Sequence, residues 1–453
     1  MVTNAHLQAR SSTQFLIGSG LLLALLITLS RWAGVPEQGR GYFIMGVVSL
    51  VVVTGVFAYL SWLLLLRPLP GLKVRARPVA ASTRRTLAAL IAMSGITLTV
   101  GAFWDEVWHR TYGLPFGEDL FWPPHQLIYS SLLIIIGLAA WSAYRLWRGE
   151  GNLTERFRAN PLLGLLALMG GLFLYMLPAD PLWHTLYGED ITAWSLPHLL
   201  LLVAFSVAML MAAALQRSAE RPSAWSAPKL TVGTLLIVIV SAFLLLFNPQ
   251  VLLTEWDTDF TFLVSQRPAW MLPALLVGLS SFVGVFALQA TRFVGAATAA
   301  GVLALGLRAV MLSVFPAAGM SADPWLAMLP PLVALDVLYA VYARRDTAPA
   351  WGIAGLVAGA GMSLVGLPLV DRLFAYPDLS AATAPGMVIA TFVAAVLAVW
   401  LGRTVAEGIV AGYQAEPQQS SSAQRPLRFV PPLALTVVVA FTLLIIVTAT
   451  PPS

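Results

Sequence analysis

The chain has 453 residues, of which 58% are hydrophobic and only 10% are charged. Soluble globular domains carry about 25% charged residues, so this composition excludes a soluble protein and predicts one that crosses a membrane several times. The chain has no cysteine, which excludes disulfides, iron–sulfur clusters and thiolate metal ligands. Its formal net charge of +5 comes from basic residues dispersed over short loops, a distribution that does not indicate a nucleic-acid partner.

Apolar runs recur along the whole chain, each about 18 residues or longer, as a bilayer core of ~30 Å requires of a spanning helix. The first run lacks a following small-residue cleavage pattern, so we interpret it as a membrane span rather than a signal peptide. We expect an all-α polytopic bundle in the lipid bilayer with about thirteen spans, at residues 13–33, 42–65, 86–104, 125–146, 161–179, 198–216, 230–247, 270–290, 294–316, 325–343, 350–369, 385–402 and 432–448.

The loops between these runs alternate in charge. Most of the 26 Lys and Arg residues fall in one set of loops, which the positive-inside rule places in the cytoplasm. The N-terminus is then cytoplasmic and the C-terminus extracytoplasmic. The stretch QAEPQQSSSAQRP within 403–431 is typical of a flexible linker. We expect four parts: N-terminal spans at 1–85, a repeat at 86–216, a second bundle at 217–402, and a linker with a last helix at 403–453.

One motif occurs twice, and both copies fall in loops predicted to be extracytoplasmic. The pattern Asp-x-x-Trp-His is followed by Tyr-Gly, then Gly-Glu-Asp, then a tryptophan, and then Pro-His at the start of the next apolar run. Four of the five histidines of the chain belong to the two copies. We expect a tandem repeat of helix, polar hairpin and helix, with two sets of candidate metal ligands: Asp105, His109 and His125, and Asp180, His184 and His198.

The spacing within each copy suits a metal ion. A carboxylate four residues before a histidine lies on the same helix face. The second histidine follows proline and is expected in the first turn of the next helix, where the helix dipole favours the neutral imidazole that a ligand requires. Two imidazoles and a carboxylate suit copper, zinc or iron(II). Nearby acids are expected to orient the imidazoles: Glu106, Glu118, Asp119, Glu189 and Asp190. The alternative is a set of aromatic and polar residues that merely lies at the membrane interface.

The two sets resemble the copper-binding segment of the C subunit of particulate methane and ammonia monooxygenases. The first set lies within FWDEVWH and FWPPH, and the second within LPADPLWH and SLPH. Thirteen residues separate His184 from His198, as in that family, whereas fifteen separate His109 from His125, and Asp180 stands where the family commonly has asparagine. The resemblance covers about residues 86–216, and the spans after 216 have no counterpart in a C subunit.

The resemblance implies a copper-dependent membrane monooxygenase that hydroxylates a small apolar substrate with oxygen. It also implies an electron donor and either partner membrane subunits or a homo-oligomer. The site would exclude water with apolar neighbours, for which the candidates are Trp108, Phe121, Trp122, Trp183 and Trp194. The alternative is a transporter or metal-handling protein without enzymatic activity. Arg308 and Asp336 lie within predicted spans and are expected to form an ion pair. This pair and the thirteen spans favour that alternative.

Overall fold

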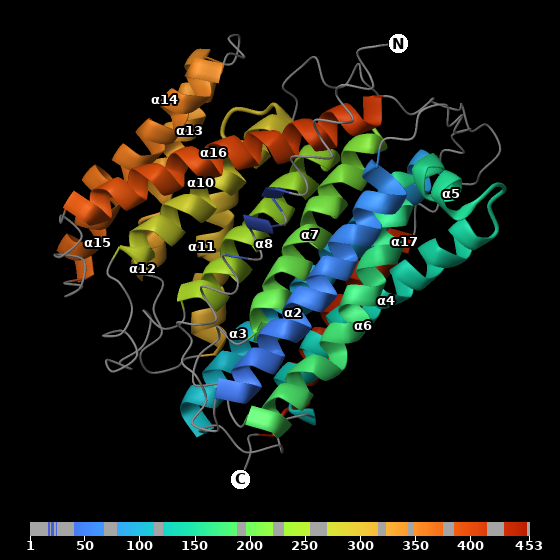
Figure 1. Cartoon of the computed structure of the whole chain (residues 1–453). Coiled ribbons are helices and arrows are strands. Elements are labelled where there is room, and N and C mark those ends of the chain that lie inside the picture. The colour runs from blue at the N-terminus through green and yellow to red at the C-terminus, as the bar shows by residue number, and fades with distance from the viewer. Residues whose placement is uncertain are drawn as a thin grey trace. The chain divides into compact units, whose positions relative to one another are not determined.

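The computed structural model describes residues 17, 18, 20, 21, 24, 40–67, 79–112, 121–187, 196–220, 231–253, 270–315, 323–342, 348–374, 385–414 and 430–450, with only the backbone at some helix ends. All regular structure within these residues is helical (Figure 1), which confirms the all-α prediction.

Ten helical segments among the described residues are long and apolar enough to cross a membrane. Each coincides with one of the predicted spans. An apolar run long enough to cross the bilayer forms a helix there, because a helix pairs all its backbone N–H and C=O groups within the segment. They are α3 (Ala81–Tyr112), α4 (Pro123–Trp147), α6 (Pro161–Tyr187), α7 (Leu196–Ser218), α8 (Val232–Leu253), α10 (Met271–Thr291), α11 (Ala296–Val314), the continuous segment α14 (Ala348–Ala360), η5 (Gly361–Gly366) and α15 (Leu367–Phe374), α16 (Pro385–Gln414) and α17 (Val430–Thr448).

The other three predicted spans are not among these ten. The span at 42–65 becomes α2 (Arg40–Ser61) followed by the π-helical turn η1 (Trp62–Leu66). The span at 325–343 is broken into α12 (Asp323–Leu326) and α13 (Leu329–Tyr342). Among the residues whose side chains are described, the apolar helices of these two regions are Val51–Leu66 and Leu329–Tyr342, each shorter than the ten. The first span, 13–33, lies almost entirely outside the described residues, so a total of thirteen stays a prediction.

The chain forms two compact units. In the first unit, α6 packs against α4 and α2, and α17 packs against α4. In the second unit, α10 packs against α8, α13 and above all α16, while α16 also packs against α14 (Figure 1). The helices α3 and α7 each contribute residues to both units. The two units do not share the boundaries of the four parts predicted from the sequence, and that division into four parts stays a prediction.

A short helix outside the membrane spans, α5 (Leu153–Ala159), is fixed to the end of η1 in the first unit. Asn152 and Glu155 form a reciprocal capping box at its start, with both hydrogen bonds at 2.9 Å. Arg158 at its other end donates hydrogen bonds to the carbonyl oxygens of Leu64 and Arg67. In these contacts backbone carbonyls rather than a carboxylate hold the guanidinium. Partial burial, and then the charge of Arg67, lower the pKa of Arg158 from its usual value.

Small residues allow the closest helix contacts in the second unit. A Cβ atom added to Gly402 on α16 would lie 2.5 Å from the carbonyl oxygen of Phe282 on α10. A Cβ atom added to Gly355 on α14 would lie 2.6 Å from the Cα of Val396 on α16. Glycine at such positions lets helix backbones approach closely in a membrane, so these two residues set the spacing of α10, α14 and α16.

This close packing yields a matched pair of variants on one helix. Gly402→Ala should destabilise the protein by about 1–3 kcal/mol, because the new methyl group meets backbone that cannot rotate away. Gly408→Ala on the same helix meets nothing within 4 Å and should be neutral or stabilising by up to about 1 kcal/mol. Thermal unfolding in detergent measures both, and equal stability of the two variants would contradict this packing.

Candidate metal centre

The helix α3 carries the first two predicted ligands. It continues unbroken to Tyr112, so Asp105 and His109 lie one turn apart on the same face, as their spacing predicts. The distance between Asp105 Oδ1 and His109 Nε2 is 3.5 Å. Both side chains are half-buried. The carboxylate and the imidazole are therefore neighbours, and a metal ion could reach both.

Aromatic side chains hold this end of α3 in place. Trp104, Trp108 and Tyr112 follow one another at four-residue intervals, with ring centroids 5.1 Å and 5.7 Å apart in edge-on contacts. Phe315, at the end of α11, stacks on Trp104 at 5.0 Å. Both tryptophans are at least 93% buried, and aromatic pairs of this geometry contribute about 0.5–1.5 kcal/mol each beyond burial. The rings fix the rotation of α3, and with it the direction of Asp105 and His109.

The third ligand, His125, lies in the first turn of α4, as predicted. Pro123 and Pro124 occupy the first two positions of that helix. A helix leaves its first amide groups without partners, but these two residues have no N–H group to satisfy. The amide of Gln126 donates to the carbonyl oxygen of Trp122 at 3.0 Å. His125 is buried, and its ring lies 5.7 Å from that of Tyr129.

These three residues form a group that could hold a metal ion. One ligand atom from each of Asp105, His109 and His125 lies within 4.8 Å of the other two. Two donors about 2.1 Å from one ion lie about 3.4 Å apart at a tetrahedral angle. The 3.5 Å between Asp105 and His109 matches that value.

The second motif occupies the same helical positions as the first. His109 is the fourth residue from the end of α3, and His184 is the fourth from the end of α6. His125 and His198 are each the third residue of the next helix. His198 is half-buried. The side chains of Asp180 and His184 lie outside the described residues, so the second ligand set and the tandem repeat stay predictions.

The structure describes only some of the other predicted site residues. Glu106 is half-buried on α3 beside Asp105, and Trp108 and Trp122 are buried as expected. Phe121 is 77% exposed, so the prediction that it shields the site from water is wrong: it precedes α4 and faces outward. The remaining residues lie outside the described side chains: Glu118, Asp119, Trp183, Glu189, Asp190 and Trp194.

The predicted ion pair between Arg308 and Asp336 is also wrong. Asp336 accepts hydrogen bonds from the amides of Gly295 and Thr298, both at 2.7 Å, and from the Thr298 hydroxyl, and so caps the start of α11. Arg308 lies ten residues beyond Thr298 on that helix, about 15 Å away at 1.5 Å per residue. A carboxylate bound at the start of α11 therefore cannot reach Arg308.

Arg308 is instead held by polar and aromatic groups that the sequence analysis missed. It is fully buried, donates from Nη1 to Gln250 Oε1 at 2.5 Å, and lies 3.7 Å from the ring centroid of Trp325 and 5.6 Å from that of Phe103. The signal in the sequence was the polar stretch Asn248-Pro249-Gln250 within the apolar run of α8. Such residues in a membrane helix usually face a polar partner.

Comparison with known proteins identifies no relative: no family model matches the chain, and no curated protein or solved structure matches it. The resemblance to the C subunit of copper membrane monooxygenases therefore stays an expectation from the motif residues alone.

The environment of Arg308 predicts that lysine cannot replace it. Arg308→Lys keeps the charge but loses the planar group that stacks on Trp325 and donates to Gln250, so we expect a destabilisation of about 2–3 kcal/mol. Arg372→Lys, at an exposed position of α15, is the control and should change stability by less than about 0.5 kcal/mol. Equal unfolding temperatures for the two variants would show that the stacking contributes nothing.

Proposed function

We propose that this chain is an integral membrane metalloprotein in which Asp105, His109 and His125 hold a copper ion. The observation that supports the proposal most is the convergence of these three ligand atoms within 4.8 Å in a chain of membrane-spanning helices. Ionisable residues in such a chain are costly unless they are paired or serve a function.

The separation of Asp105 and His109 favours a shared ion over a direct hydrogen bond. Hydrogen-bonded N–H and O atoms lie about 2.7–3.2 Å apart, whereas these two atoms are 3.5 Å apart. The same 3.5 Å is close to the separation of about 3.4 Å that two ligands of one ion adopt.

The donor set is one that copper binds well. Sites built from imidazole and carboxylate follow the order in which copper(II) binds more tightly than iron(II), cobalt, nickel or zinc. Asp105 supplies one negative charge to the site, and the two histidines bind through neutral imidazoles. The resemblance of FWDEVWH and FWPPH to the copper-binding segment points to the same ion. Zinc and iron(II) are the alternatives that a metal analysis distinguishes.

The surroundings of α3 support oxygen chemistry as the function of this ion. A bound copper ion supplies the redox chemistry that activates oxygen. Val107 and the buried rings of Phe103, Trp104 and Trp108 keep water from the helix that carries two of the ligands, and an apolar wall of this kind suits a small apolar substrate. We therefore propose oxygen-dependent hydroxylation, with electrons from a separate donor and with partner membrane subunits or further copies of the chain.

A transporter or metal-handling protein is the alternative function. Two features favoured it, the number of spans and an ion pair between Arg308 and Asp336. The ion pair is not formed, because Asp336 caps α11 and Arg308 contacts Gln250. We propose in addition that both motifs face the extracytoplasmic side, as the distribution of basic residues predicts, and that Asp180, His184 and His198 hold a second ion.

Metal analysis of the purified protein tests the proposal. We expect two equivalents of copper per wild-type chain after dialysis. His109→Ala and His125→Ala should each remove one equivalent, and His184→Ala should remove the other. Loss of a residue that merely orients a ligand lowers metal affinity roughly 10- to 100-fold, so loss of a ligand itself should lower it by more than about 100-fold. Mass spectrometry of the protein-bound metal measures each variant.

His6 provides the matched control, because it is the one histidine outside both motifs. His6→Ala should retain all the copper. Zinc or iron in place of copper, lost in the same variants, would keep the site but refute copper chemistry. Wild-type protein that holds no metal after incubation with copper would refute the site itself.

A further inference from the structure

A pocket in the second unit lies apart from both histidine motifs. It has a volume of about 250 Å³ and is bounded by the end of α10, the end of α13 and the start of α14. Leu288, Leu335 and Leu338 form an apolar wall. Tyr339, Tyr342 and Trp351 add aromatic rings that each carry one polar group. The pocket is therefore amphipathic, with an apolar side and a polar side.

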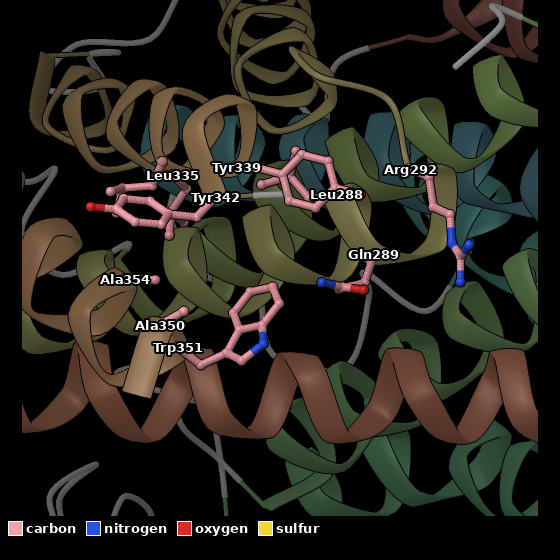
Figure 2. A pocket seen from close by; sticks show the side chains of 10 residues that line it. Leu288, Gln289, Arg292, Leu335, Tyr339, Tyr342, Ala350, Trp351 and Ala354 are labelled. Carbon is pink, nitrogen blue, oxygen red and sulfur yellow. The ribbon is translucent and has the colours of Figure 1, made fainter. Parts of the chain in front are cut away.

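Arg292 supplies the charge of this pocket. Figure 2 shows Arg292 at one end of the cavity and Tyr342 at the other, with the amide of Gln289 and the indole of Trp351 between them. Among the described residues that line the pocket, none carries a carboxylate. A second guanidinium, that of Arg403, lies 5.4 Å from the ring centroid of Trp351 and is paired with Glu407 at 2.6 Å, so Arg292 is the charged group of the pocket itself. The region is suited to an anion.

The backbone of Arg292 is unusual for its residue type. Its φ of 55° is left-handed, and it is the one such residue other than glycine in the described part of the chain. Glycine is the residue that helices usually place after their last turn in this conformation, because other side chains are strained there. Arginine at this position has a strained backbone that glycine would not have, which indicates that the arginine side chain is required.

Hydrogen bonds hold both ends of the turn that begins at Arg292. The turn from α10 to α11 comprises residues 292–295. The Arg292 amide donates to the carbonyl oxygen of Leu288 at 2.7 Å, and Asp336 on α13 accepts from Gly295 at the other end of the turn. Both ends of the turn are thus tied to helices that line the cavity. The backbone that carries the Arg292 side chain is therefore fixed, which lowers the entropic cost of binding at this position.

We propose that this pocket binds an anionic phospholipid of the surrounding bilayer. Arg292 would bind the phosphate through charge-assisted hydrogen bonds. The hydroxyl and indole groups of the aromatic rings suit the level of the lipid headgroups, and the leucine wall suits the first carbons of the acyl chains. A volume of about 250 Å³ is smaller than the roughly 300–1,000 Å³ of pockets for drug-sized ligands, which matches a lipid that inserts only its headgroup region.

Native mass spectrometry of the delipidated full-length protein tests this proposal. The probes are phosphatidylglycerol, phosphatidylcholine and inorganic phosphate. We expect wild-type protein to bind phosphatidylglycerol at least about tenfold more tightly than phosphatidylcholine, since the choline ammonium of the latter neutralises the phosphate and repels the guanidinium of Arg292. Arg292→Gly should lose this preference, and Ala350→Leu, which fills the pocket, should weaken binding of both lipids.

Two controls separate lipid binding from folding and from general attraction. Arg292→Gly should unfold at the same temperature as wild type or higher, because glycine adopts a φ of 55° without strain. Arg372→Gln removes one exposed charge outside the pocket and should keep the preference. The proposal is overturned if Arg292→Gly keeps the preference, if Arg372→Gln loses it equally, or if inorganic phosphate displaces phosphatidylglycerol at equal concentration.

Discussion

The candidate metal centre depends on one constraint, which is that α3 continues unbroken past Asp105 and His109. In a helix, residues four apart lie on one face, so the carboxylate and the imidazole meet at 3.5 Å without any loop to position them. The rings of Trp104, Trp108 and Phe315 hold the rotation of this helix end. The prolines before His125 start the next helix without amide groups that require partners. Helices rather than loops thus carry all three ligands.

The membrane also explains the hydrogen bonds of the other buried polar groups. Each such group in a span must find a partner within the protein. Asp336 is satisfied by the amides and hydroxyl at the start of α11, and Arg308 by Gln250 and the face of Trp325. Neither uses an opposite charge for these contacts. Asp336 also holds one end of the turn that begins at Arg292, through its hydrogen bond from Gly295.

Much of the fold could be predicted from the sequence, because the hydropathy of a segment indicates directly whether lipid or water surrounds it as a helix. The ten long apolar helices coincide with predicted spans, and the helical positions of Asp105, His109 and His125 follow from their spacing and from the prolines. The breaks could not be predicted, since α12 and α13 divide an apolar run that has the length of one span. The partners of Arg308 and Asp336 were also missed, because charge in a sequence suggests an opposite charge, whereas long-range packing offered an amide and an indole ring. The second ligand set remains a prediction from sequence.

The most direct test of the central claim is the electron paramagnetic resonance spectrum of the copper(II)-loaded protein. We predict hyperfine coupling to two imidazole nitrogens at the site of the first motif, measured in a His184→Ala background that isolates it. In that background His109→Ala should reduce the coupling to one nitrogen, and His6→Ala should leave it unchanged. A spectrum that shows no nitrogen coupling, or one that His109→Ala does not alter, would contradict the assignment of Asp105, His109 and His125 as ligands of one ion.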